Sequence, residues 1–102
     1  MVLSTMNSLI FEWDEVKNKS NKLKHGVSFE TAAHVFYDPL VMSVQDRHLH
    51  GQERWQSIGM VNGSVLLLVA HLFQEEDSAV VIRIVSARKA TPYERRRYEE
   101  GI

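Results

Sequence analysis

The sequence predicts one α+β domain, in which an antiparallel sheet packs helices on one of its faces. Its 102 residues suffice for a single domain, and its 44% hydrophobic and 25% charged residues are an ordinary globular balance. Helical and strand-like segments follow one another in the order β-α-α-β-β-β-β-α. We expect residues 9–102 to form this domain and residues 1–8 to be a flexible tail.

The first predicted elements are a strand and a helix. Leu9–Trp13 is short, apolar and rich in aromatic side chains, which is typical of a strand. Asp14 can cap a helix that Gly26 then closes. Val16 and Leu23 are among the few apolar side chains that can anchor this helix, so we expect it to lie on the surface.

The next segments predict a second helix, a strand and a loop. Ser28 can cap the helix, and Pro39 ends it because the residue before a proline is pushed out of helical geometry. Its apolar side chains recur at helical spacing: Phe29, Ala32, Ala33 and Phe36. Leu40–Asp46 is then typical of a strand and Arg47–Gly51 of a polar loop.

The second half of the chain has the clearest local signals. Two strands, Gln52–Val61 and Ser64–Phe73, flank Asn62-Gly63, the strongest two-residue signal for a hairpin turn. Ala79–Arg88 is rich in β-branched residues and predicts a further strand. A capping box then introduces the last helix, Pro92–Glu100.

The hairpin places three candidate catalytic residues together. A two-residue turn at Asn62-Gly63 pairs Arg54 with His71, and we expect both on the sheet face that the helices leave open. Arg83 joins them there if the apolar side of its own strand lies under the helices.

Such a cluster suits the cleavage of RNA by its own 2′-OH, which requires proton carriers and cations for the charged phosphorane. His71 can carry protons near neutral pH, Glu53 can act as a base, and Arg54 and Arg83 can hold the phosphate. The alternative is structural, with the arginines bridged to carboxylates and the histidine hydrogen-bonded within the sheet.

Further cations are concentrated in two windows, although the net charge is only −1. Lys24 and His25 can contact phosphate, or complement the dipole at the end of the first helix. Arg88 and Lys89 are candidates for an RNA-binding surface, and a solvated face is the alternative.

Cysteine is absent, so neither a disulfide nor a thiolate metal site can form. Asp46, His48 and His50 resemble a zinc site only weakly, and we expect no metal and no cofactor. The first ten residues lack the pattern of a signal peptide, and Val65–Leu72 is too short to span a bilayer. We therefore expect a cytoplasmic protein.

Several segments together resemble the BrnT family over about residues 9–101. They are FEWD at residues 11–14, KHGVSF at 24–29, QER at 52–54, RIVSARKA at 83–90 and ERRRYE at 94–99. The pairing of KHGVSF with RIVSARKA is the most specific part of the resemblance. One departure is Leu72, where the family often has a threonine.

The resemblance implies a RelE-like fold and a ribonuclease toxin of a type II toxin–antitoxin pair that cleaves RNA without a metal and arrests growth. It implies a BrnA-like DNA-binding antitoxin that neutralises the toxin, represses their operon together with it, and makes the only contact with operator DNA. It assigns activity to Glu53, Arg54 and Arg83, and less securely to Arg88. The alternative is a non-catalytic module that binds RNA or protein on the same fold.

Overall fold

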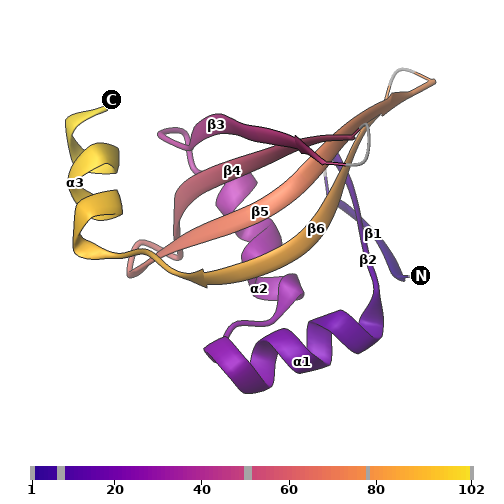
Figure 1. Ribbon diagram of the computed structural model, residues 1–102, viewed down its shortest axis with the longest axis horizontal. Helices are drawn as coiled ribbons and strands as arrows, with labels where there is room; N and C mark the ends of the chain where they lie inside the picture. The colour runs from indigo at the N-terminus through magenta and orange to yellow at the C-terminus, as the bar shows by residue number, and fades with distance from the viewer. Residues whose placement is uncertain (1, 7–8, 50–51, 78, 102) are drawn as a thin grey trace.

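The structure is a computed structural model that describes residues 2–6, 9–49, 52–77 and 79–101. Six strands form one sheet in the order β1-β2-β6-β5-β4-β3 (Figure 1). The strands are β1 (Val2–Met6), β2 (Leu9–Trp13), β3 (Met42–Leu49), β4 (Gln52–Val61), β5 (Val65–Glu76) and β6 (Ala79–Lys89). The helices are α1 (Glu15–His25), α2 (Phe29–Ala32), the 3-10 helix η1 (Ala33–Tyr37) and α3 (Pro92–Glu100).

The N-terminal part of the sheet differs from the prediction in two ways. Residues 2–6, expected in a flexible tail, form β1 and pair with β2 in antiparallel orientation. The sheet is also mixed rather than antiparallel, because β2 runs parallel to β6 from Leu9↔Val80 to Glu12↔Arg83. Parallel neighbours need a long connection between them. Here everything from α1 to β5 provides it, and only the tertiary structure brings the two strands together.

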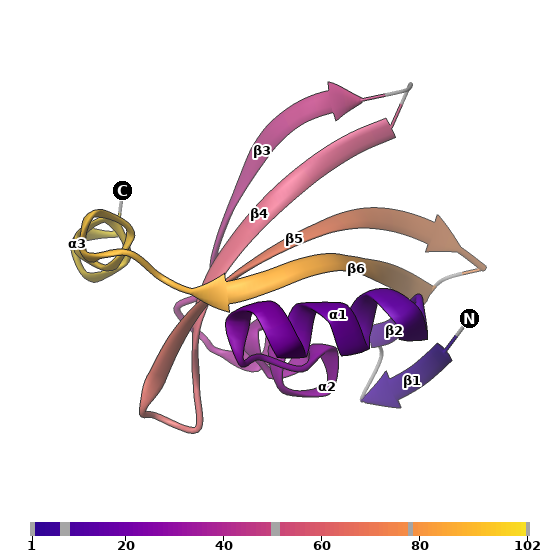
Figure 2. The same ribbon diagram turned by 60° about the horizontal axis from the view of Figure 1, so that its bottom comes forward.

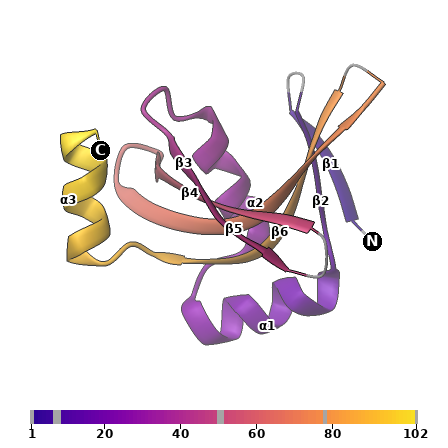
Figure 3. The same cartoon turned by 45° about the horizontal axis from the view of Figure 1, so that its top comes forward.

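The helices do not all lie on one face of the sheet, whereas the sequence predicted that they would. Figure 2 shows α1 and α2 together, with α3 apart from them beyond the end of β6. On β5, Leu67 belongs to the main core with α2 and η1, while Leu66 and Leu68 form a second cluster with Tyr98 of α3. Successive residues of a strand point to opposite faces. We call the face with α2 and η1 the helix face and the other the open face, which α3 covers only at one end (Figure 3).

The β4–β5 hairpin has a register one residue away from the predicted one. Asn62 and Gly63 adopt the expected left-handed backbone, and the amide of Ser64 donates to the carbonyl of Val61 at 3.1 Å. The strands nevertheless pair Val61 with Val65, so three residues form the loop. A shift of one residue moves every cross-strand neighbour. The structure therefore places Trp55 opposite His71, where the sequence predicted Arg54.

Helix α1 is attached by polar side chains instead of the apolar anchors that we expected. Val16 is 77% and Leu23 90% exposed, while Asn18 and Asn21 face inward and are buried. Asn18 accepts from the amide of Phe29 at 2.8 Å. The caps of α1 are as predicted, with Asp14 before it and Gly26 after it.

Strand β3 extends further than the sequence predicted. It runs from Met42 to Leu49, so residues 47–49 lie in a strand and not in the expected polar loop. Its register with β4 shifts between Gln45 and Arg47, where a bulge interrupts the pairing. Alternation is lost at such a bulge, which explains why the sequence pattern stops being strand-like there.

Candidate functional site

The open face carries a half-buried patch of mixed character. Ile58 and Leu68 of the α3 cluster fix which residues of β4 and β5 share this face, and Arg83 pairs with Leu72. The open-face patch consists of Arg54, Gln56, Ala70, Leu72 and Arg83, each of intermediate exposure. The predicted placement of Arg54 and Arg83 on one open face therefore agrees with the structure.

Arg83 is paired on this face with Glu12, a carboxylate that was not among the predicted site residues. Its Nη1 lies 3.4 Å from Oε1 of Glu12, which is opposite it in the parallel β2–β6 register. Glu12 stands between the buried Phe11 and Trp13, and this alternation signals that its side chain points away from the core. Only the pairing of β2 with β6, however, brings Glu12 beside Arg83.

His71 does not join the arginines, so the prediction of one open-face cluster is wrong for this residue. Its side chain is 0% exposed on the helix face, with its ring centroid 4.8 Å from that of Phe36 and 4.6 Å from that of Phe73. Its neighbour Leu72 takes the open-face position instead. A group with no exposed surface cannot touch RNA in this conformation.

The polar contacts of His71 run through two serines. Its Nε2 is hydrogen-bonded to Oγ of Ser57 at 2.7 Å, and Ser57 in turn to Oγ of Ser43 at 2.7 Å. Its Nδ1 is buried without a hydrogen-bond partner among the described residues. Burial lowers the pKa of His71 to about 4, so the imidazole is neutral at physiological pH. This arrangement matches the structural alternative for His71.

Glu53 is also separated from the arginines. It is exposed and precedes Arg54 in β4, so the two side chains point to opposite faces of the strand. The structure therefore splits the four predicted catalytic residues, with Arg54 and Arg83 on the open face and Glu53 and His71 on the other side.

Two further predicted RNA contacts, Lys24 and His25, line a groove between α1 and β6. The α1–β6 groove is lined by Val16, Lys17, Ser20, Asn21, Lys24, His25, Val85 and Ser86. In β6, Ser86 pairs with Ala70 and Ile84 with His71, so Val85 is the extra residue of a bulge at this place. Arg83 of the open-face patch lies two residues before Val85 of the α1–β6 groove. The patch and the groove are therefore neighbours along β6.

Arg88 and Lys89 have different surroundings. Arg88 holds the carboxylate of Glu94 with two hydrogen bonds of 2.8 and 2.9 Å, and this contact lowers the pKa of Glu94. Glu94 is the third residue of α3 and also accepts from the amide of Thr91 in the predicted capping box. Arg88 thus stabilises the start of α3, whereas Lys89 is exposed.

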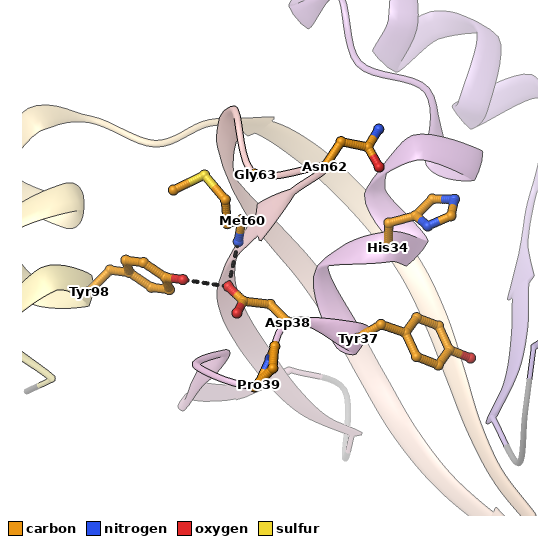
Figure 4. Close-up of a pocket in the computed structure, with 8 residues that line it drawn as sticks. All are labelled: His34, Tyr37, Asp38, Pro39, Met60, Asn62, Gly63 and Tyr98. Carbon is orange, nitrogen blue, oxygen red and sulfur yellow. Dashed lines mark hydrogen bonds between the residues drawn. The ribbon is translucent and has the colours of Figure 1, made fainter.

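A hollow lies where η1, β4 and α3 meet (Figure 4). It is lined by His34, Tyr37, Asp38, Pro39, Met60, Asn62, Gly63 and Tyr98. One oxygen of Asp38 accepts from the Tyr98 hydroxyl and from the amide of Met60, and the first of these bonds raises the pKa of Tyr98 to about 12. These contacts fasten α3 to the sheet, and we interpret the hollow as a structural joint.

The described residues contain no group of three potential metal-ligating side chains. Of Asp46, His48 and His50, which resemble a zinc site only weakly in the sequence, His50 lies outside the described residues. No helix in the described part of the chain is long and apolar enough to cross a membrane.

Comparison with known proteins agrees with this fold. The family described as "Ribonuclease toxin, BrnT, of type II toxin-antitoxin system" matches residues 13–94. The crystal structure of the Brucella abortus ribonuclease toxin BrnT is similar in fold, with a TM-score of 0.61, 23% identity, and coverage of 83% of this chain and 99% of that chain. No curated protein matches the chain. The match to the family covers most of the sequence, and the chain therefore belongs to the BrnT family of ribonuclease toxins of type II toxin–antitoxin systems.

Proposed function

We propose that this chain is an active endoribonuclease that holds RNA on the open-face patch and in the adjoining α1–β6 groove. The observation that supports this most strongly is the presence of Arg54 and Arg83 on one accessible face. Guanidinium groups bind phosphate through paired hydrogen bonds and stay charged at any physiological pH. Lys24 and His25 extend the cationic path along α1.

The chemistry that fits this surface is attack of the RNA 2′-OH on the neighbouring phosphate, without a metal ion. The 2′-oxygen forms a bond to phosphorus, the bond from phosphorus to the 5′-oxygen breaks, and a 2′,3′-cyclic phosphate results. The 2′-OH gives its proton to the general base, and the departing 5′-oxygen takes a proton from water. Arg54 and Arg83 would stabilise the negative charge that develops on the phosphorane. We propose Glu12 as the general base, because its carboxylate lies beside Arg83 on the open face. His71 cannot serve here from its buried position, and Glu53 points to the other side of β4.

The wider role follows from the family. We propose that a BrnA-like DNA-binding antitoxin neutralises this toxin, that the complex represses their shared operon, and that the free toxin arrests growth in the cytoplasm. We also propose that the fold is RelE-like. A DNA contact by the toxin itself is not required, since the antitoxin supplies it.

The proposal can be tested with purified protein and with cells. Wild-type protein should cleave single-stranded RNA in the presence of a chelator, and its expression without an antitoxin should stop growth. Arg83→Ala should reduce cleavage by roughly a hundredfold or more, the usual size of a lost transition-state contact. Arg96→Ala removes the same charge from an exposed position on α3 and should cleave like wild type.

Circular dichroism should show that the Arg83 variant remains folded. If wild-type protein binds RNA but leaves it intact, the chain is the non-catalytic binding module instead. If Arg83→Ala and Arg96→Ala cleave equally well, the open-face patch is not the active site. Glu12→Gln should reduce cleavage by roughly a hundredfold or more while keeping RNA binding, and an unchanged cleavage rate would exclude Glu12 as the base.

A further inference from the structure

Helix α1 presents an apolar strip to solvent. Val16 and Leu23 are 77% and 90% exposed, and both are aliphatic. They are seven positions apart in the sequence, almost two full turns, so they lie above one another on the same side of the helix. The opposite side is the one that Asn18 and Asn21 attach to the rest of the molecule. The strip therefore lies on the side of α1 that faces solvent.

Lysines flank this strip on both sides. At 100° per residue, Lys17 and Lys24 lie along one flank, and Lys19 and Lys22 along the other. All four of these lysines are exposed, and Glu15 is the one acidic residue of α1. An apolar strip between two cationic rows is complementary to an amphipathic helix that has a leucine-like strip between acidic rows.

We infer that α1 is the docking site of an acidic amphipathic helix supplied by a protein partner. The exposed valine and leucine favour a protein partner over RNA. An RNA backbone is bound mainly through charged groups and hydrogen bonds, which aliphatic side chains cannot provide. Val16 lines the α1–β6 groove together with Lys17 and Lys24. A helix seated on the strip would therefore also cover cations that we propose for RNA binding.

This inference rests on the proposed function for its biological meaning, because the partner would be the antitoxin. Binding at α1 would then inhibit the enzyme by occupying part of the RNA path. Neutralisation would require no contact with the buried His71 and no change in the fold.

The test uses the whole protein and a synthetic peptide of about 18 residues, long enough for several helical turns. Leucines at helical spacing form one side of this peptide and glutamates form its flanks. A scrambled peptide of the same composition tests whether the leucines must lie on one side of the helix. A version with lysines in place of the glutamates tests whether the flanks must be acidic. Binding is measured by fluorescence anisotropy, and its location by backbone amide chemical shifts of the labelled protein.

The acidic peptide should bind, shift the amide signals of α1, and bind far more weakly at high salt. Leu23→Ser should weaken binding by roughly ten- to a hundredfold, the effect of losing one buried leucine contact. Leu40→Ser is the matched control, because Leu40 is 70% exposed but lies after η1, away from α1. It should bind like wild type.

Absence of binding, equal binding of the scrambled peptide, or equal effects of the two serine variants would overturn the inference. Leu23→Ser alone should leave RNA cleavage unchanged, and the bound peptide should inhibit cleavage by wild-type protein. A protein that binds the peptide at α1 but cleaves no RNA would refute the proposed function and leave the docking site standing. A protein that cleaves RNA but ignores the peptide would do the reverse.

Discussion

The side-chain amide of Asn21 occupies both backbone hydrogen-bonding groups of Ala87. It donates to the carbonyl oxygen at 2.8 Å and accepts from the amide at 3.2 Å, and it donates again to the carbonyl of Val27 at 2.9 Å. The pairing of β2 with β6 ends at Arg83, so beyond that point Asn21 supplies what a neighbouring strand would otherwise supply. A polar side chain thus protects the edge of β6 and holds α1 in place.

Asn21→Ala should lower the free energy of unfolding by about 2–3 kcal/mol, because it leaves the backbone groups of Ala87 and Val27 buried without partners. Chemical denaturation measures this loss. Ser20→Ala, on the exposed side of the same helix, should change stability by less than about 0.5 kcal/mol. Equal stability of the two variants would show that Asn21 does not anchor α1.

His71 should make the protein less stable in mild acid. Its pKa is about 4 in the folded chain and 6.5 in the unfolded chain, so the unfolded state alone takes up a proton between these values. Proton uptake by the unfolded chain therefore lowers the free energy of unfolding as the pH falls from about 7 toward 4. The total loss from His71 is about 3 kcal/mol, and above about pH 7 there is none.

Urea denaturation at several pH values should show that His71→Gln flattens the stability profile between pH 7 and 4, whatever its effect on absolute stability. His34→Gln, which removes an exposed histidine, should keep the wild-type slope. A slope that survives in His71→Gln would assign the acid sensitivity to other groups.

Gly59 should tolerate no side chain. A Cβ atom there would lie 2.8 Å from Cγ1 and 2.8 Å from the carbonyl oxygen of Val35 in η1. Gly59→Ala should therefore cost about 1–3 kcal/mol of stability, as overpacking in a close-packed core does. Because the backbone oxygen remains, adding Val35→Ala should not restore the wild-type value. Thermal unfolding of the single and double variants tests both statements.

We expect Arg88 to contribute to stability and its neighbour Lys89 to RNA binding. Arg88→Ala breaks the contact with Glu94 and should lower the free energy of unfolding by about 1 kcal/mol, because the Arg88 side chain is 38% exposed and solvent weakens the pair. Lys89→Ala should leave stability unchanged and reduce the salt dependence of RNA binding by about one charge. The opposite pattern would make Arg88, and not Lys89, the RNA contact.

Much of the secondary structure was predictable because its signals are local. Strands β2 and β4 and helix α3 have the bounds that the sequence predicted, and the caps Asp14 and Gly26 end α1 as expected. Capping depends on residues within one turn of each other, so the sequence contains all the information it needs.

The candidate site was only partly predictable. The alternation along β4 and β6 put Arg54 and Arg83 on the open face, and the structure agrees. His71 was misplaced, since one additional loop residue at Ser64 moves the opposite strand by one position. The place of Glu12 beside Arg83 was not predicted, because a single sequence does not indicate which distant strand will pair with β2.

The sequence by itself determined the bounds of β2, β4 and α3, the caps of α1, and the family to which the chain belongs, since these depend on neighbours along the chain and on motifs that can be read directly. The tertiary structure alone decided the hairpin register, the β2–β6 pairing, and the burial of two asparagines in place of Val16 and Leu23. Those features arise from contacts between segments far apart in the chain, where a difference of one residue reverses which side of a strand meets solvent.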